Sequence, residues 1–471
     1  MNEIEKKQST RGNILLWSMY DLANTIFSMG IVSLTVIKFF TLLGMQQGMS
    51  WSQANFLAGL AGSISTVLVA LTIPFMGALS DKSGERKSKV VILGSLTILT
   101  SGFVFILSDF WFAYFLFIIA NITYQWGNLF YDAMIPHICA DDEIGRVSAI
   151  GIAIGYFGSF IAIAILFILP MIGIPAHTTL SPTGAPLAAD ETTIISASEI
   201  ILGDFLWMWL ICGVAFFITA IPFLWVRERT QETKVSFGKL FSESRTELVQ
   251  TTKEVIRDKN MLLFMIGWIL TVDVVNTVIA YMLPAAEDAW GLSGFLPLAL
   301  IFVGVIGASV LTLGIGPICD KRGPKAAFLI VGVGYLLVLV IAMFADTTDP
   351  SLGTLWLILL FAAALIIGGA QGSTWVANRQ MVIELAPENK IGQYFGYSKL
   401  VGKGGSAIGL IIFASVLSVT QEITDSIPLS YSVGFFVLGI IYAIGLVFLM
   451  LVKDHHKEYL DGERAPYKEN D

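Results

Sequence analysis

Long apolar stretches follow one another along almost the whole chain of 471 residues. A helix needs about 20 apolar residues to cross the hydrocarbon core of a bilayer. Lipid offers no partners for free backbone N–H and C=O groups, so stretches of this kind must be helical. The pattern predicts an all-α membrane protein with twelve transmembrane helices, over residues 13–44, 52–80, 88–107, 110–136, 143–172, 203–226, 259–285, 295–319, 324–345, 353–384, 389–419 and 428–452.

The composition excludes most other classes of protein. Apolar residues make up 55% of the chain and charged residues only 14%, whereas a soluble chain carries about 25% charge. A soluble enzyme and a disordered protein are therefore excluded, and the lipid bilayer is the expected environment. The formal net charge of −8 indicates no affinity for nucleic acid.

No group of residues has the spacing of a catalytic, metal or nucleotide site. The cysteines Cys139, Cys212 and Cys319 are far apart, and the histidines form no metal-binding pattern. The segment 402–406 contains a Gly-Lys pair but lacks the spacing of a phosphate-binding loop. We therefore expect no enzyme activity and no cofactor, and a gradient of protons or Na⁺ as the source of energy.

Lysine and arginine residues fall in alternate connections between the predicted helices, and the remaining connections carry acidic residues. By the positive-inside rule, both termini are predicted to be cytoplasmic. The same pattern predicts an external loop over 173–202 and a cytoplasmic linker over 227–258. Part of that linker has helical apolar spacing, which suits either a membrane-surface helix or a solvated one.

The two halves of the chain repeat each other. Asp21-Leu-Ala-Asn24 in the first predicted helix matches Asp273-Val-Val-Asn276 in the seventh, and Ile144-Gly145 matches Ile391-Gly392. Such duplication is typical of secondary transporters, which bind their substrate between the halves. The predicted organisation is a six-helix bundle over 1–226, the linker over 227–258, and a second six-helix bundle with a short cytoplasmic tail over 259–471.

A motif of glycines, one aspartate and basic residues follows the second predicted helix and recurs after the eighth. The first copy comprises Gly77, Asp81, Lys82, Gly84 and Arg86, and the second comprises Gly316, Asp320, Lys321 and Gly323. The glycines permit a tight turn, and an aspartate can accept hydrogen bonds from a helix N-terminus or from an arginine. The pattern resembles the signature of the major facilitator superfamily, and this resemblance implies a cytoplasmic gate that closes in the outward-open state. A turn without any gating role is the alternative.

The segment WSMYDLANTIFSMG in the first predicted helix narrows the resemblance. It is similar to the opening of the family that includes the fungal vacuolar amino-acid effluxers of autophagy and their bacterial relatives. The segments PHICADDEIGRVSAIGIAIGYFGS and ELAPENKIGQYFGYSKLVGKGGSAIG also resemble that family. The resemblance implies a multi-pass transporter of the bacterial inner membrane that functions as a monomer. The glycoside–cation symporters share the Asp-Leu-Ala-Asn segment and are the closest alternative.

Polar residues inside the predicted helices are the candidate site. A charged residue at the bilayer centre costs about 2.5–3.5 kcal/mol, so such residues usually face a cavity. The family resemblance implies that the first, fourth, seventh and tenth helices line it, and the polar stripes fall on these helices. The candidates for binding substrate or protons in a central cavity are Asp21, Asn24, Gln125, Asn128, Asp132, Asp273, Asn276, Gln371, Trp375, Asn378, Arg379, Lys399 and Lys403.

Several of these residues have a purely structural alternative. Asn24 and Asn276 can hydrogen-bond between helices without touching a solute. Asp21 and Asp273 lie near the cytoplasmic ends of their helices and can act as caps or gates. The Lys399 side chain can extend to the membrane interface, as long basic side chains do.

The charges predict the type of solute. The repeat places Asp132 and Arg379 opposite each other, which predicts an ion pair across the cavity. Arg379, Lys399 and Lys403 make the second half cationic, so we expect a small anionic or zwitterionic organic solute, such as an amino acid. A buried carboxylate can carry a proton, with Asp132 preferred over the other acids. The predicted function is a secondary active transporter that works by alternating access. The alternatives are a glycoside symporter or a lipid or drug exporter of the same fold, a channel, and a membrane sensor or scaffold.

Overall fold

Helices make up all the regular structure in the described part of this computed structural model, which covers residues 11–33, 35–83, 86–106, 109–171, 207, 209–229, 249–348, 350–405 and 408–461. The first half contains α1 (Arg11–Phe27), the π-helix η2 (Ser28–Ser33), α2 (Val36–Gln46), α3 (Trp51–Ser83), α4 (Arg86–Ile106), α5 (Phe110–Ala133), α6 (Ile135–Ile138), the 3₁₀-helix η3 (Asp141–Glu143), α7 (Ile144–Met171), the helical residues 209–220 and the 3₁₀-helix η4 (Ile221–Trp225). The second half contains the helical residues 249–257, α10 (Lys259–Pro284), η5 (Ala285–Ala289), α11 (Leu296–Phe344), α12 (Gly353–Leu385), η6 (Glu388–Lys390), α13 (Ile391–Gly405), α14 (Ile408–Thr424), α15 (Ile427–Leu451) and α16 (His456–Leu460).

The predicted membrane helices agree with the observed ones. Nine helices in the described residues are long and apolar enough to cross a membrane. One of the nine, α11, is two helices joined at a kink, and it covers the eighth and ninth predicted spans. Two further helices are not among the nine and account for the fourth and sixth predicted spans. They are α5, whose second half carries amide and carboxylate side chains, and the shorter Trp209–Trp225. The protein is therefore an all-helical, multi-pass membrane protein.

Two predicted helices are interrupted. The first is interrupted by η2, and directly after it the hydroxyl of Thr35 donates to the carbonyls of Gly30 and Ile31 at 3.2 and 2.7 Å. The eleventh is described as α13 and α14, on either side of residues 406–407. The predicted external loop at 173–202, residues 230–248 of the predicted linker, and Gly84 of the gate motif lie outside the described residues.

Local signals explain where several helices begin and turn. The Asp258 side chain caps α10 by accepting from the amides of Asn260 and Met261 at 2.8 and 3.2 Å. Asp109 caps α5 through the amide of Phe112 at 2.7 Å. Inside α11, Gly323 has a φ of 79°, a conformation that glycine adopts most easily. This residue forms the kink between the two helices that α11 joins.

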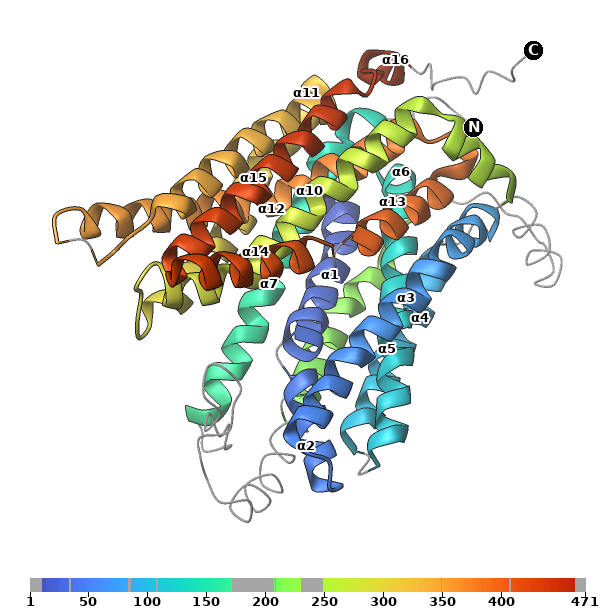
Figure 1. The fold of residues 1–471 in the computed structure, drawn as a ribbon. Coiled ribbons are helices and arrows are strands. Elements are labelled where there is room, and N and C mark those ends of the chain that lie inside the picture. The colour runs from blue at the N-terminus through green and yellow to red at the C-terminus, as the bar shows by residue number, and fades with distance from the viewer. Residues whose placement is uncertain are drawn as a thin grey trace.

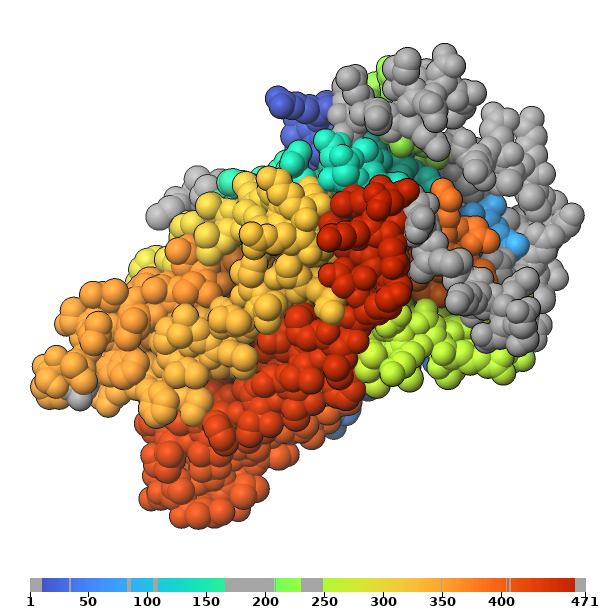
Figure 2. All heavy atoms as spheres, turned by 90° about the horizontal axis from the view of Figure 1, so that it is seen from above, coloured from blue at the N-terminus to red at the C-terminus, as the bar shows by residue number. Residues whose placement is uncertain are grey.

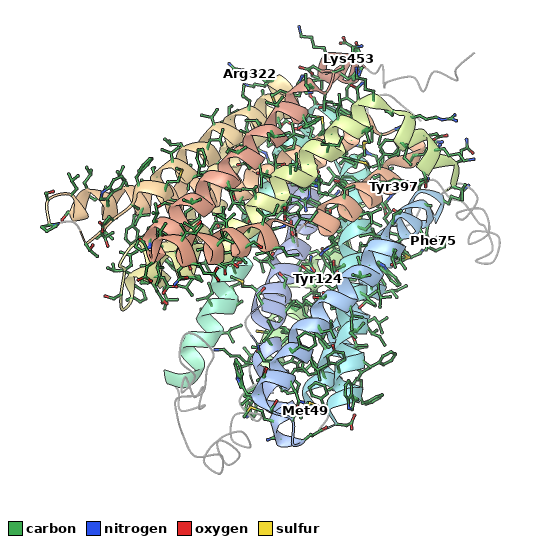
Figure 3. All side chains as sticks on the ribbon, viewed as in Figure 1. Met49, Phe75, Tyr124, Arg322, Tyr397 and Lys453 are labelled. Atoms are coloured by element: carbon green, nitrogen blue, oxygen red, sulfur yellow. The ribbon has the colours of Figure 1, made fainter. Side chains whose placement is uncertain are left out.

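The helices pack into two bundles, one from each half of the chain (Figure 1). The bundles converge at the end of the molecule that carries α6 and α16, which we call the α16 end, and they diverge toward α2. Contacts between the bundles run mainly from α3 to α13 and from α7 to α11. Arg322 and Lys453 lie at the α16 end, and Met49 lies at the opposite end (Figure 3).

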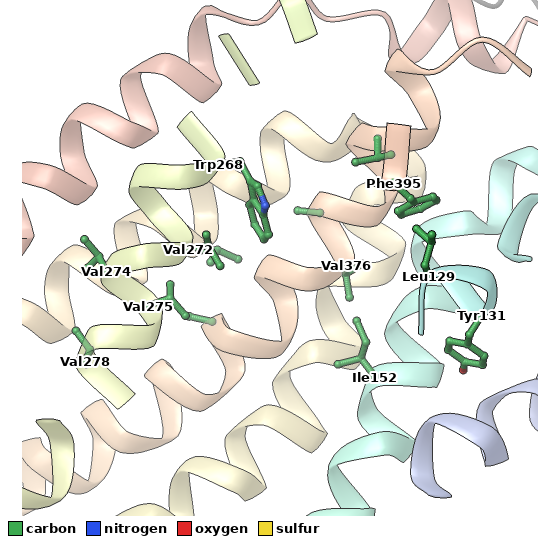
Figure 4. Packing of buried hydrophobic residues seen from close by; sticks show 14 of the residues in the cluster. Leu129, Tyr131, Ile152, Trp268, Val272, Val274, Val275, Val278, Val376 and Phe395 are labelled. Carbon is green, nitrogen blue, oxygen red and sulfur yellow. The ribbon is translucent and has the colours of Figure 1, made fainter. Parts of the chain in front are cut away.

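Apolar residues of both bundles form one buried cluster. Leu129 and Ile152 from the first half and Val376 and Phe395 from the second belong to it (Figure 4). Large apolar side chains are also widely exposed on the outer faces of the helices, for example Leu71 and Ile358. Such a surface is unfavourable in water and suits acyl chains.

Candidate functional site

A cavity of about 480 Å³ lies between the two bundles. It is lined by residues of α1, α3, α5 and α7 on one side and of α10, α12 and α13 on the other. Among the candidates from the sequence, those that line it are Asp21, Asn24, Gln125, Asn128, Asp132, Asn276, Trp375, Asn378, Arg379, Lys399 and Lys403.

Four charged side chains meet across this cavity. Asp132 of α5 contacts Arg379 of α12 at 2.8 Å and Lys399 of α13 at 2.5 Å. Arg379 also lies 3.6 Å from Asp21 of α1. The ion pair expected from the repeat is therefore present, and it joins the two bundles. The acids come from the first half of the chain and the cations from the second.

Two aromatic rings lie beside the Arg379 guanidinium on the side of the first bundle. Trp17 and Tyr131 stack in parallel, with centroids 4.3 Å apart and an interplanar angle of 1°. The Arg379 guanidinium carbon lies 6.0 and 5.9 Å from the centroids of the two rings, within reach of a cation–π attraction. Asp21, Asp132, Trp17 and Tyr131 thus form a socket in one bundle for a cation from the other. We call it the Arg379 socket.

Neutral polar groups line the rest of the cavity. The side-chain amide of Asn24 donates to Asn128, so α1 and α5 are joined inside the first bundle. In the second bundle, the hydroxyl of Ser398 donates to Asn378 at 3.0 Å. Trp375 packs edge-on against Trp268, with centroids 5.4 Å apart. The cavity therefore combines charges, amides and an aromatic wall.

Asp273 and Gln371 are not among the residues that line the cavity, in contrast to the expectation. Asp273 is buried on the face of α10 that packs against α14, where a side chain at Gly409 would come within 2.7 Å of its carboxylate. Asn276 lies three residues further along α10, about 300° around the helix, and reaches the cavity. Helical spacing alone does not decide which face of α10 points inward.

The two aspartates of the repeated motif cap helices of the opposite bundle. Asp81 at the end of α3 accepts hydrogen bonds from the amides of Gly392 and Gln393 at 2.7 and 2.9 Å, at the start of α13. Arg86 lies 3.6 Å from the same carboxylate. A carboxylate at a helix N-terminus satisfies free amides and interacts favourably with the helix dipole.

The second copy makes the same contact in the other direction. Asp320 in α11 accepts from the amides of Gly145 and Arg146 at 2.7 and 3.1 Å, at the start of α7. The paired contacts lie at the α16 end, where they hold the bundles together on that side of the cavity. Lys321 is exposed, and Lys82 is partly exposed.

Glycines let the backbones approach at these contacts. A side chain at Gly77 would come within 2.3 Å of the Gly392 carbonyl oxygen, and one at Gly145 within 2.7 Å of the Gly316 carbonyl oxygen. All four glycines belong to matched segments of the repeat. Their shared function is close packing between the bundles.

Some lining and gate residues were not found from the sequence. Tyr156, Phe395 and Ser398 line the cavity, and the Glu228 carboxylate accepts from the amides of Arg86 and Lys87 at 3.2 and 2.9 Å. An isolated tyrosine or serine in an apolar helix carries no periodic signal. For Glu228, the sequence offers only its position directly after the predicted span 203–226, where a gate residue can lie.

Two pseudo-symmetric helical bundles with a polar cavity between them define a transporter of the major facilitator superfamily. Two solved structures support the fold. The chain is similar to the transporter FucP in the outward conformation, with a TM-score of 0.69 and 13% identity over 95% of this chain and 99% of that chain. It is also similar to the proton:xylose symporter XylE, with a TM-score of 0.62 and 13% identity over 96% and 98% of the two chains.

Residues 48–459 match the family model described as vacuole effluxer Atg22 like, and the chain belongs to this family. It is 25% identical over 448 residues to the uncharacterized MFS-type transporter YxiO of Bacillus subtilis (strain 168), covering 93% of this chain and 94% of that protein. It is 21% identical over 438 residues to an uncharacterized protein of Aquifex aeolicus (strain VF5), covering 90% and 95%. The resemblance expected from the sequence is confirmed, and the chain is a transporter and not an enzyme.

Proposed function

We propose that the protein carries a small anionic or zwitterionic organic solute, such as an amino acid, by alternating access. The excess of positive charge in the cavity supports this proposal. The cavity is lined by three basic residues, Arg379, Lys399 and Lys403, and by two acidic residues, Asp21 and Asp132. With all five ionised, the cavity holds one more cation than anions, which a solute carboxylate can neutralise. An ammonium group of the same solute would lie toward the acids of the first bundle.

We further propose proton coupling through Asp21, in place of Asp132, the acid preferred from the sequence. Asp132 contacts two cations at 2.8 and 2.5 Å, so a proton there would break both contacts. Asp21 has one longer contact, 3.6 Å to Arg379. A proton on Asp21 releases Arg379 from part of its socket, and a solute carboxylate can then take the vacated position. Solute and proton therefore bind together, and the scheme works in either direction of transport.

The contacts of Asp81 and Asp320 close the α16 end, so we assign the structure to the outward-open state, with that end cytoplasmic. Basic residues such as Arg322 and Lys453 at this end favour the same orientation. The proposed location is the bacterial plasma membrane with both termini inside. We retain 1–226, 227–258 and 259–471 as bundle, linker and bundle. Because one chain supplies both walls of the cavity and both gate contacts, we propose a functional monomer.

The test is solute binding to purified protein followed by counterflow in proteoliposomes. Free amino acids should raise the melting temperature and exchange across the membrane, and their methyl esters should do neither because they lack the carboxylate. A Lys403→Gln variant should weaken binding of the acids about tenfold or more. Equal binding of acid and ester would contradict the proposal.

A glycoside symporter is the second candidate, because Asn24, Asn128, Asn276 and Asn378 beside Trp375 also suit a sugar ring. Methyl glycosides in the same assay distinguish the two. Stabilisation by glycosides but not by amino acids, with no effect of Lys403→Gln, would favour this alternative.

A further inference from the structure

The short helix α16 lies outside the spanning helices, yet two of its side chains are almost completely buried. His456 is 5% exposed and Tyr459 is 2% exposed. From above, the C-terminal part of the chain lies against α11 and borders the region around η3 and the start of α7 (Figure 2). A terminal helix of five residues has little intrinsic stability, so its contacts with the bundles determine its position.

His456 is bound to the gate region of the second bundle. Its Nδ1 lies 2.8 Å from Oε1 of Glu384 in α12, and its Nε2 lies 3.0 Å from the carbonyl oxygen of Asp320 in α11. Gly323 makes room for it, because a side chain there would come within 2.9 Å of His456 Cβ. The backbone of Asp320 is thus held by His456, and its carboxylate caps α7.

Tyr459 reaches the opposite bundle. Its hydroxyl donates to Oδ1 of Asp141 at 3.0 Å, in η3 directly before α7. The corresponding segment after the sixth predicted span contains Glu228, which accepts hydrogen bonds from the amides of Arg86 and Lys87. These contacts stay within the first bundle. Tyr459 therefore adds a contact between the bundles beside the Asp320 cap.

We propose that residues 453–461 form a clasp that holds the cytoplasmic gate closed. In this clasp His456 is a positioning residue for Asp320, and Tyr459 ties the second bundle to Asp141 of the first. The proposal rests on the proposed function only in assuming that the gate opens during transport. Breaking the clasp shifts the protein from the outward-open toward the inward-open state.

Cys319 supplies a native reporter of the gate. It is fully buried beside Gly145, whose substituted side chain would come within 2.5 Å of Cys319 Cβ. With Cys139 and Cys212 replaced by alanine, the rate of alkylation of Cys319 by N-ethylmaleimide reports separation of α7 from α11. A second reporter, Ser80→Cys in a background lacking the native cysteines, reports separation of α3 from α13, because Ser80 is buried there against Gly392.

Tyr459→Phe removes one hydroxyl and keeps the ring, so it should fold. We expect alkylation at both reporters to rise about three- to tenfold, the range for one ordinary hydrogen bond to a solvent-accessible acceptor. Asp141→Ala removes the acceptor and should have a similar effect, and the double variant should add nothing to either. Tyr431→Phe is the matched control, since Tyr431 donates to Asp288 at 3.4 Å inside the second bundle, and it should leave both rates unchanged.

Three outcomes would overturn the clasp. The first is an unchanged alkylation rate in Tyr459→Phe, and the second is additive effects of Tyr459→Phe and Asp141→Ala. The third is a rise at Cys319 without one at Ser80→Cys, which would show only local loosening around α16. Neither readout needs a solute, so a wrong solute class would leave this result intact and would appear only in the binding assay.

Discussion

Asp132 and Arg379 occupy matched positions in the two halves of the chain, and their side chains meet at 2.8 Å across the central cavity. Each bundle thus supplies one member of a buried ion pair. A buried pair adds little net stability when intact, but removing one partner leaves an uncompensated charge. The pair therefore links the two bundles while remaining open to competition from a charged solute.

Replacing Asp132 should therefore be severe. Asp132→Asn leaves Arg379 and Lys399 without that carboxylate, so we expect the free energy of unfolding to fall by about 3–5 kcal/mol and transport to be lost. Asp132→Asn combined with Arg379→Gln should recover part of the stability. Thermal melting in detergent measures the loss of stability and its partial recovery, and counterflow in proteoliposomes measures transport. Asp273→Asn is the control and should transport normally, because Asp273 does not line the cavity; loss of transport there would contradict the site.

Asp21→Asn should uncouple transport from the pH gradient. The amide keeps the shape of the side chain but cannot take up or release a proton. Counterflow of solute, which needs no net proton movement, should persist, and uptake driven by an imposed pH gradient should fall more than tenfold. The result that contradicts this assignment is unchanged pH-driven uptake in Asp21→Asn proteoliposomes.

Gly77→Ala should open the gate. Its new methyl group would meet the Gly392 carbonyl oxygen at 2.3 Å, and overpacking of this kind costs about 1–3 kcal/mol. We expect faster alkylation of Ser80→Cys, because a smaller fraction of the protein would be in the outward-open state. Gly59→Ala on the same helix α3 meets nothing within 4 Å and should leave the alkylation rate unchanged. Equal effects of the two substitutions would point to loss of helix flexibility instead of a clash.

The stability of the clasp should decrease as the pH rises. Burial lowers the pKa of His456, but the hydrogen bond and charge of Glu384, the Asp320 carbonyl and the charge of Asp454 together raise it above its ordinary value. The stabilisation is therefore complete below the ordinary histidine pKa and is lost as the pH rises through the raised value. Between about pH 6 and pH 8, the melting temperature of the wild type should fall relative to that of His456→Gln. Parallel curves would contradict this role of His456.

Sequence reasoning found the helices because the signal for each is spread over many residues. The twelve predicted spans, the repeat and the Asp132–Arg379 pair all rest on patterns of this kind. It did not find the break at η2, because a single π-helical turn leaves the apolar pattern of the helix unchanged. It also placed Asp273 in the cavity, because matching Asp21 fixes a position along a helix but not the face that points inward.

The sequence by itself determined the membrane class, the duplication and the family, since hydropathy and repeated motifs are properties of the linear chain. Only the tertiary structure decided which polar groups meet. Arg379 lies in a socket of Trp17, Asp21, Tyr131 and Asp132, and Tyr459 reaches Asp141, because helices distant in sequence cross at these points. Contacts between the bundles depend on helix rotation and crossing, which the packing of many apolar side chains sets together and no local pattern encodes.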